Sequence, residues 1–119
     1  MKRDICEIEH TDEEKVLRVR AEMPSGDEIR GICDIFKILS EPTRLKILMA
    51  LSLDSLCVCE LASLLDVTQS AVSHQLRILR NAGMVDYERD GKMARYYLRD
   101  NGVVEFIEQC SKLHSRSEE

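Results

Sequence analysis

The sequence predicts a mainly helical domain with a β-hairpin wing, in the element order of a winged helix-turn-helix. The first observation is a short apolar segment, a tight turn and then a longer amphipathic segment, over residues 58–81. The second is a change to two-residue periodicity over residues 84–98, which is typical of paired strands. The third is composition, because only 4% of the 119 residues are aromatic and none is Trp. This composition favours a helical core of aliphatic side chains over a β-sandwich.

The N-terminal part is expected to be an arm followed by a short helix. Residues 1–10 show no clear periodicity. Thr11 and Glu14 then have the spacing of a capping box, which predicts a helix to about Ala21. A Pro-Ser-Gly break follows. We therefore expect residues 1–22 to form an N-terminal metal-ligand arm with a short helix, and residues 23–119 to form the winged helix-turn-helix domain with dimerising terminal helices.

Two helices are expected before the helix-turn-helix. Ser25 and Glu28 repeat the capping-box spacing and open a helix whose apolar stripe reaches about Leu39. Pro42 lies in the first turn of the next helix, where its missing N–H costs nothing. The apolar positions that should make this second helix mostly buried are Leu45, Ile47, Leu48, Met49 and Leu51.

Within the helix-turn-helix, Thr68 is the predicted N-cap of the longer helix at residues 69–81, and Gly83 fits a left-handed stop after it. The expected core face of this helix consists of Val72, Leu76 and Leu79. The side chains expected to point inward from the short helix, at residues 58–65, are Leu61, Leu64 and Leu65.

The C-terminal part is predicted to be a hairpin and a last helix. Asp90-Gly91 is a strong signal for a two-residue hairpin turn, with the return strand at residues 92–98. The last helix is expected from about Asp100 to His114.

The charge of the chain is unevenly distributed. The net charge is −5, which argues weakly against a nucleic-acid partner. Residues 69–99, however, contain six basic and three acidic side chains, a local net charge of +3. A DNA-binding protein needs a local basic face rather than a basic whole, so double-stranded DNA remains the expected partner.

The candidate DNA contacts lie on the longer helix and on the hairpin. The second helix of such a unit enters the major groove with its N-terminal residues near the base edges. Gln can read adenine bidentately, Ser can contact a base edge or a phosphate, and Arg suits phosphate. The predicted DNA-binding residues are Gln69, Ser70, Ser73, His74, Arg77, Arg89, Lys92 and Arg95. The alternative interpretation is a polar helix face and a solvated hairpin without DNA contact.

The expected compartment decides how the cysteines are interpreted. No signal peptide and no apolar run of about 20 residues is seen, so a cytoplasmic location is expected. Five cysteines there are more often metal ligands, catalytic groups or core residues than disulfides. We see no nucleophile–base pairing, phosphate loop or carboxylate dyad, so an enzyme is not expected.

Cys57 and Cys59 flank a single Val and are candidate metal ligands. On an ideal helix they would lie on nearly opposite faces, so at least one must lie in the non-helical entry to the short helix. Two further ligands are needed, and Cys6 and His10, spaced i, i+4, can supply them from the arm. Cys₃His is an established tetrahedral set for Zn²⁺, and thiolate-rich sites also suit softer ions.

The alternative interpretation makes the thiols part of the packing. Cys57 and Cys59 would then be small apolar core residues, and His10 would be solvated. Cys33 and Cys110 lie on apolar stripes, where we expect core or dimer-interface positions.

The chain resembles the ArsR/SmtB family of metal-responsive repressors over essentially its whole length. The matching runs are LSEPTRLKIL at 39–48, LCVCEL at 56–61, QSAVSHQL at 69–76, and Met84-Val85 with GKMARYY at 91–97 in the wing. The arm, with Cys6 and His10, is most similar to a cadmium/lead-responsive group within this family. That group has a second Cys where His10 stands here, a change that would move preference towards Zn²⁺ without excluding Cd²⁺ or Pb²⁺.

The resemblance implies a homodimer that binds palindromic operator DNA when metal-free and is released by Zn, Cd or Pb, with no organic cofactor. It also implies that Cys6 and His10 of one subunit meet Cys57 and Cys59 of the other. Many members bind Zn²⁺ at a second site on the C-terminal helices. Here Asp100 matches its first position, but Gly102 and Leu113 do not match the next two, so that site is expected to be broken and Asp100 to be an N-cap.

Three other functions fit part of the pattern. An As(III)- or Sb(III)-responsive repressor of the same fold needs only the three thiolates of Cys6, Cys57 and Cys59. A thiol-redox-sensing regulator would use Cys57 or Cys59 and leave His10 without a role. A zinc-storage or structural zinc protein would leave the predicted DNA-reading helix and wing unexplained.

Overall fold

The structure is a computed structural model that describes residues 12–118. Its elements are α1 (Glu13–Glu22), α2 (Gly26–Leu39), α3 (Pro42–Leu51), β1 (Leu56–Cys57), α4 (Val58–Leu65), α5 (Gln69–Asn81), β2 (Val85–Asp90), β3 (Met93–Leu98) and α6 (Gly102–Ser117). The chain divides into two compact units between Asp34 and Ile35. The expected helical domain with a hairpin is confirmed. Within the described residues, no helix combines the length and the apolar character needed to cross a membrane.

The first unit contains α1 and the beginning of α2. Asp12, and not Thr11, is the N-cap of α1, since its side chain accepts a hydrogen bond from the Lys15 N–H at 3.0 Å. The helix therefore begins one residue later than the capping-box spacing predicts. The second box behaves as expected, because the Ser25 hydroxyl accepts from the Glu28 N–H at 3.1 Å.

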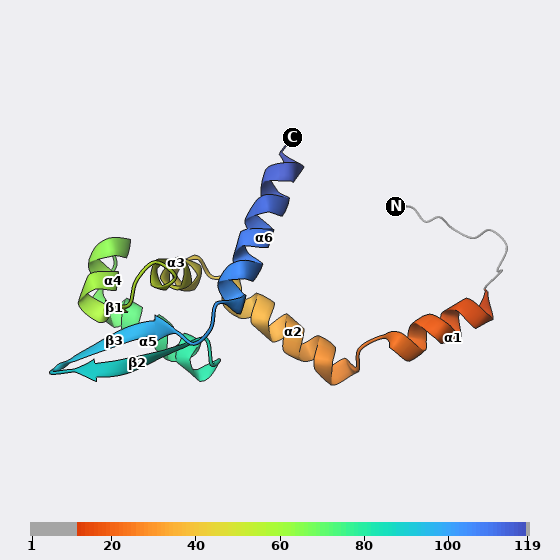
Figure 1. Cartoon of the computed structure of the whole chain (residues 1–119), viewed down its shortest axis with the longest axis horizontal. Helices are drawn as coiled ribbons and strands as arrows, with labels where there is room; N and C mark the ends of the chain where they lie inside the picture. The colour runs from red at the N-terminus through yellow and green to blue at the C-terminus, as the bar shows by residue number, and fades with distance from the viewer. Residues whose placement is uncertain (1–11, 119) are drawn as a thin grey trace. The chain divides into compact units, whose positions relative to one another are not determined.

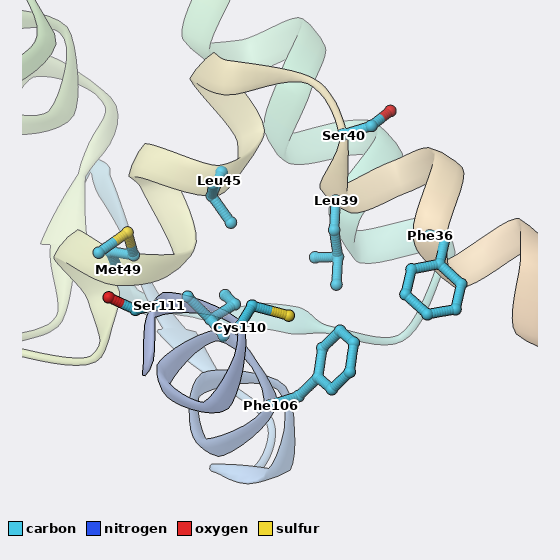
Figure 2. A pocket seen from close by; sticks show the side chains of 9 residues that line it. Phe36, Leu39, Ser40, Leu45, Met49, Phe106, Cys110 and Ser111 are labelled. Carbon is cyan, nitrogen blue, oxygen red and sulfur yellow. The ribbon is translucent and has the colours of Figure 1, made fainter. Parts of the chain in front are cut away.

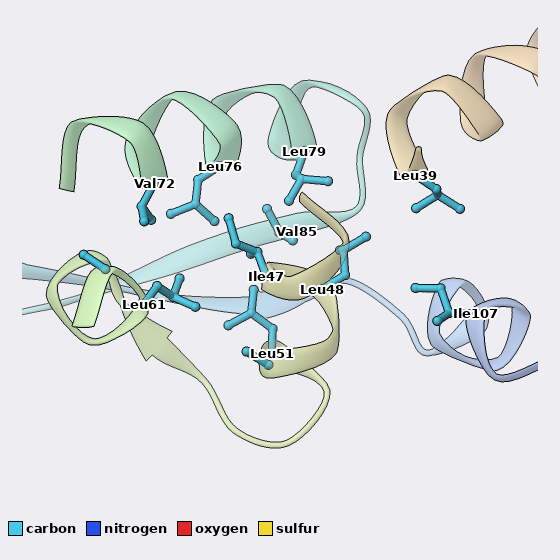
Figure 3. Packing of buried hydrophobic residues seen from close by; sticks show 12 residues of the cluster. Leu39, Ile47, Leu48, Leu51, Leu61, Val72, Leu76, Leu79, Val85 and Ile107 are labelled. Carbon is cyan, nitrogen blue, oxygen red and sulfur yellow. The ribbon is translucent and has the colours of Figure 1, made fainter. Parts of the chain in front are cut away.

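The core of the second unit is a cluster of aliphatic side chains from α3, α4, α5 and β2, together with Leu39 of α2 and Ile107 of α6. Val72, Leu76 and Leu79 project from α5 towards Ile47 and Leu48 of α3 (Figure 3). All three expected core residues of α5 are at most 1% exposed. Helices α4 and α5 thereby pack against α3 and against the start of β2, where Val85 is buried.

The turn between α4 and α5 sets the angle of the helix-turn-helix. Asp66 ends α4 with φ 58° in the left-handed region, where Asp is one of the few tolerated side chains. Thr68 is the N-cap of α5, as predicted, and its hydroxyl accepts from the Ala71 N–H at 3.0 Å. Gly83 has φ 79° after the helix, which confirms the predicted stop.

The sheet has three antiparallel strands in the order β1-β3-β2, and the β2–β3 hairpin projects away from the helices (Figure 1). Asp90 pairs with Met93, so the two-residue turn is Gly91-Lys92 and not Asp90-Gly91. Gly91 has φ 67°, and glycine at the first turn position is typical of a type II′ hairpin. Asp90 can then stay in the strand, where its carboxylate accepts from the Arg95 guanidinium at 2.9 Å.

Two predicted burial positions are wrong. Leu64 is 61% exposed and Met49 is 48% exposed. In α4 the inward positions are Leu61 and Ala62, because the helix is only eight residues long and contacts the core along one narrow side. Helical periodicity alone cannot tell which neighbouring Leu of such a short helix faces the solvent.

We expect Leu61→Ala to destabilise the protein by about 2–5 kcal/mol, since it empties a fully buried position. Leu64→Ala on the same helix is the matched control and should change the free energy of unfolding by about 0.5 kcal/mol or less. Urea denaturation followed by circular dichroism measures both. Equal losses for the two variants would contradict this packing of α4.

Candidate metal centre and nucleic-acid interface

Cys57 stands where β1 ends and α4 begins. Its backbone is extended, with φ −92° and ψ 172°, and it is the N-cap of α4. Cys59 follows in the first helical turn and is exposed, whereas Cys57 is 3% exposed. This confirms that one cysteine of the pair lies in the non-helical entry to the helix. The two thiols therefore do not project from opposite faces of one helix.

Charged neighbours surround this junction. The Glu60 carboxylate accepts a hydrogen bond from the Cys57 N–H at 2.9 Å. This backbone hydrogen bond, followed by the Cys57 side chain, holds the pKa of Glu60 below its ordinary value, and Arg95 adds a smaller effect in the same direction. The hydrogen bond with Asp90 is the largest cause that raises the pKa of Arg95, and Glu60 and Cys57 contribute as well. Glu60 was not among the predicted site residues, although a Glu three residues after an N-cap is a recognisable signal.

Cys57 and Cys59 line one shallow hollow between the start of α4 and the tip of the wing. The other lining residues are Val58, Lys92, Met93 and Ala94. The structure thus brings together two of the four predicted ligands. Cys6 and His10 lie outside the described residues. Within residues 12–118 no group of three or more His, Cys, Asp or Glu side chains is arranged to hold a metal.

This donor set fits a thiophilic metal in part. Two sulfur ligands on one open hollow are half of a tetrahedral thiolate-rich site. The residues that would hold such an ion are Cys57 and Cys59, and the remaining ligands must come from elsewhere.

The predicted DNA-reading residues of α5 lie on its exposed side. Val72, Leu76 and Leu79 fix the inner face of the helix against the core. The opposite face leaves all five predicted residues accessible: Gln69, Ser70, Ser73, His74 and Arg77. The geometry is therefore that of a helix that can enter a groove with its first turns.

Two arginines hold α5 in place. The Arg44 guanidinium donates to the Ile38 carbonyl oxygen and to the Gln75 side-chain oxygen, each at 2.9 Å. Arg80 lies 4.6 Å from the centre of the Tyr87 ring and 3.5 Å from the Asp86 carboxylate. Arg44 thus ties α5 to the end of α2, and Arg80 ties it to the wing. These links could not be predicted from the sequence, because each joins side chains of different elements and has no local pattern.

The three predicted wing cations differ in their surroundings. Arg89 and Lys92 are exposed. Arg95 is partly buried and paired with Asp90, and its backbone lies opposite Cys57 in the β1–β3 ladder. Arg95 therefore has a structural partner in the protein itself.

A second, larger hollow is lined mainly by apolar side chains of α2, α3 and α6 (Figure 2). Its volume is about 480 Å³. Phe36 and Phe106 meet on one side with their ring centres 5.6 Å apart, and Met49 lies on the other side. Cys110 lines this hollow and, like Cys33, is exposed, so neither thiol is a core residue.

The prediction that Asp100 is the N-cap of the last helix is wrong by one residue, although Asp100 still binds a backbone N–H at the start of α6. Its carboxylate accepts from the Gly102 N–H at 2.7 Å, although the N-cap position itself is Asn101. At the other end, His114 lies 3.2 Å from the Glu118 carboxylate in an i, i+4 pair. Asp100 and His114 thus have local partners at the two ends of α6.

The sequence and the fold are both similar to those of known bacterial transcriptional regulators. Residues 41–87 match the family described as "Bacterial regulatory protein, arsR family". A cadmium resistance transcriptional regulatory protein CadC homolog of Staphylococcus aureus is 36% identical and covers 98% of this chain and 95% of its own. A transcriptional repressor SmtB homolog of Synechocystis sp. is 41% identical and covers 82% of this chain and 74% of its own. The crystal structure of the AntR antimony-specific transcriptional repressor has a TM-score of 0.72 at 30% identity, over 82% of this chain and 88% of that one.

The difference in exposure between the two thiols predicts a difference in reactivity. In the folded protein, a bulky maleimide should label Cys59 at least about tenfold faster than Cys57, since access governs thiol modification. Mass spectrometry of the digested protein measures each site. Labelling in denaturant is the control and should remove the difference, whereas equal rates in the folded state would contradict the placement of Cys57.

Proposed function

Because this chain belongs to the ArsR family of bacterial regulatory proteins, we propose that it is a metal-responsive DNA-binding transcriptional repressor. In this proposal the metal-free dimer binds operator DNA, and binding of a thiophilic ion releases it. The observation that carries the proposal is the pair of thiols that line one hollow at the start of the helix-turn-helix, together with residues of the wing.

DNA is bound through α5 and the wing. The exposed residues at the start of α5 are suited to base edges and phosphate, and Arg77 and the wing cations are suited to phosphate. Because operator DNA is the partner, the site of action is the cytoplasm.

The metal site combines residues of two subunits. Cys57 and Cys59 of one subunit and Cys6 and His10 of the other form a Cys₃His set, which accepts Zn²⁺, Cd²⁺ or Pb²⁺. The names of the cadmium-resistance regulator and the SmtB-type repressor support an inducer of this kind. Metal binding and DNA binding oppose each other, so operator DNA weakens metal binding by the same factor by which metal weakens DNA binding.

The dimer is formed by apolar surface that one copy leaves uncovered. On α6, Phe106 is 38% and Leu113 is 61% exposed. These side chains and the apolar hollow beside them are suited to burial against a second copy, which also supplies core that a small domain lacks. A homodimer would also place two α5 helices on the two half-sites of a palindrome.

Titration of the anaerobic, metal-free protein with Cd²⁺ tests the metal site. We expect an ultraviolet thiolate-to-metal charge-transfer band that saturates at about one ion per subunit, with an intensity for about three thiolates. Cys6→Ser should lose about one third of it. Cys33→Ser is the matched control and should leave the band unchanged.

The absence of a saturating band, or a band intensity that Cys6→Ser does not change, would contradict the metal site and favour the thiol-redox regulator.

A second candidate inducer is As(III) or Sb(III), which the likeness to the antimony-specific repressor favours. His10→Ala should weaken Zn²⁺ binding but spare arsenite, which needs only three thiolates.

Leu113→Glu tests the dimer. A charge in a buried apolar interface should raise the dimer dissociation constant at least about tenfold, or about 1.4 kcal/mol. Sedimentation equilibrium measures it. Leu53→Glu is the control, because Leu53 is 87% exposed and lies outside α6. A wild-type monomer, or equal effects of the two variants, would contradict an α6 interface.

A further inference from the structure

The side chain of Arg44, on α3, contacts both the end of α2 and the middle of α5. Its Nε donates to the Ile38 carbonyl oxygen and its Nη1 donates to the Gln75 Oε1, each at 2.9 Å. Its Nη2 lies 3.5 Å from the Lys37 carbonyl oxygen. Lys37 and Ile38 belong to the last turn of α2, where carbonyl groups have no partner in the regular helical pattern. One guanidinium thus joins three helices.

The position of Arg44 is itself fixed by the start of α3. Glu41 is the N-cap of this helix, and its carboxylate accepts a hydrogen bond from the Arg44 N–H at 2.8 Å. The side chain of Arg44 is half-buried, and neutral oxygen atoms receive its donors. A planar guanidinium with a fixed fork of donors can serve several acceptors at once, which the compact ammonium of Lys does less well. The guanidinium is therefore engaged inside the protein.

Gln75 lies beside the inner face of α5 and is half-buried. The residues that bury this face are Val72, Leu76 and Leu79. Their aliphatic contacts are non-directional, so small rotations of the helix about its axis cost little. A hydrogen bond, in contrast, has a preferred length and direction. The contact between Arg44 and Gln75 therefore fixes a rotation of α5 that the aliphatic core alone leaves less defined.

We propose that Arg44 is a positioning residue for base readout: through Gln75 it fixes the rotation of α5, so that selectivity for the operator depends on a side chain that does not touch DNA. This inference rests on the proposed function and deepens it. Side chains that read bases must be held within about 10–20° of their productive geometry, whereas contacts to phosphate carry no sequence information. Loss of the link should therefore reduce selectivity rather than non-specific affinity.

Substitutions at Gln75 separate this role from the contribution of Arg44 to stability. Gln75→Met has a similar shape but removes the acceptor, and it leaves the guanidinium on the Ile38 and Lys37 carbonyl oxygens. The end of α2 therefore stays capped. Gln75→Glu keeps an acceptor at the same place and is the conservative variant.

The test measures affinity for two DNA duplexes. The first is a duplex that the wild-type protein selects from a random pool, and the second has the same bases in shuffled order. Fluorescence anisotropy on the metal-free protein, at several salt concentrations, gives the ratio of the two affinities and the slope of log affinity against log salt. Gln75→Met should lower the ratio at least about fivefold, the lower end of what one good base contact contributes. The affinity for the shuffled duplex and the salt slope should stay unchanged.

Two further comparisons identify the link itself. Gln75→Glu should weaken binding to both duplexes through its added charge but keep their ratio. Arg44→Met should lose as much selectivity as Gln75→Met, and the double variant should lose no more, because the two side chains form one interaction. Lys46→Met removes an exposed cation from the same helix as Arg44 and is the matched control, which should keep the ratio.

An unchanged ratio in Gln75→Met, with the wild type selective, would overturn the role of Arg44 alone. An equal loss in Gln75→Glu would overturn it as well, since Gln75 would then read DNA itself. In Arg44→Met, a salt slope lower by about 0.9 for each phosphate would show that Arg44 binds the DNA backbone instead. If Arg44→Met does not fold, Gln75→Met and Gln75→Glu decide. A wild type that selects no duplex would overturn the proposed function and this role with it.

Discussion

Burial of one aliphatic cluster between α3, α5, α4 and the root of the wing is the constraint on which the rest of the domain depends. Ile47, Leu61, Leu79 and Val85 come from four different elements, and each is 0% exposed. The chain has two Phe and no Trp, so packing of branched aliphatic side chains has to supply the core. Because α5 buries one stripe in this cluster, its other face is turned outward, and the exposed residues of its first turns follow from that packing.

The junction at Cys57 combines three structural tasks that depend on the same core. Cys57 is a strand residue opposite Arg95, the N-cap of α4, and a lining residue of the hollow that Lys92 also lines. In the proposed metal site, β1 and the first turn of α4 already hold the backbone of both cysteines, which would reduce the ordering cost of binding an ion. A change at this junction reaches α4 through its first turn and the wing through the ladder.

Most helices and their caps could be predicted from the sequence, because capping residues, proline and glycine act locally. Thr68, Gly83 and the inner face of α5 were predicted on that basis and are confirmed. Leu64 and Met49 were misplaced, since their burial depends on which neighbours lie above a short helix. The hairpin turn differs by one residue because Asp90 and Met93 form a strand pair. The two-residue strand β1 and the place of Lys92 in the lining of the hollow have no local signal, since both arise from contacts across more than thirty residues of chain.

The order β1-β3-β2 also bears on how the protein behaves at high concentration. An exposed hairpin offers unpaired edge groups that can template association with other chains. Here the central strand β3 is covered on one side by β2 and, near its middle, on the other side by β1. The outer strand β2 carries four charged residues among its six, and β1 is only two residues long. The charges on β2 and the short length of β1 therefore oppose edge-to-edge pairing between copies, although the wing itself is exposed.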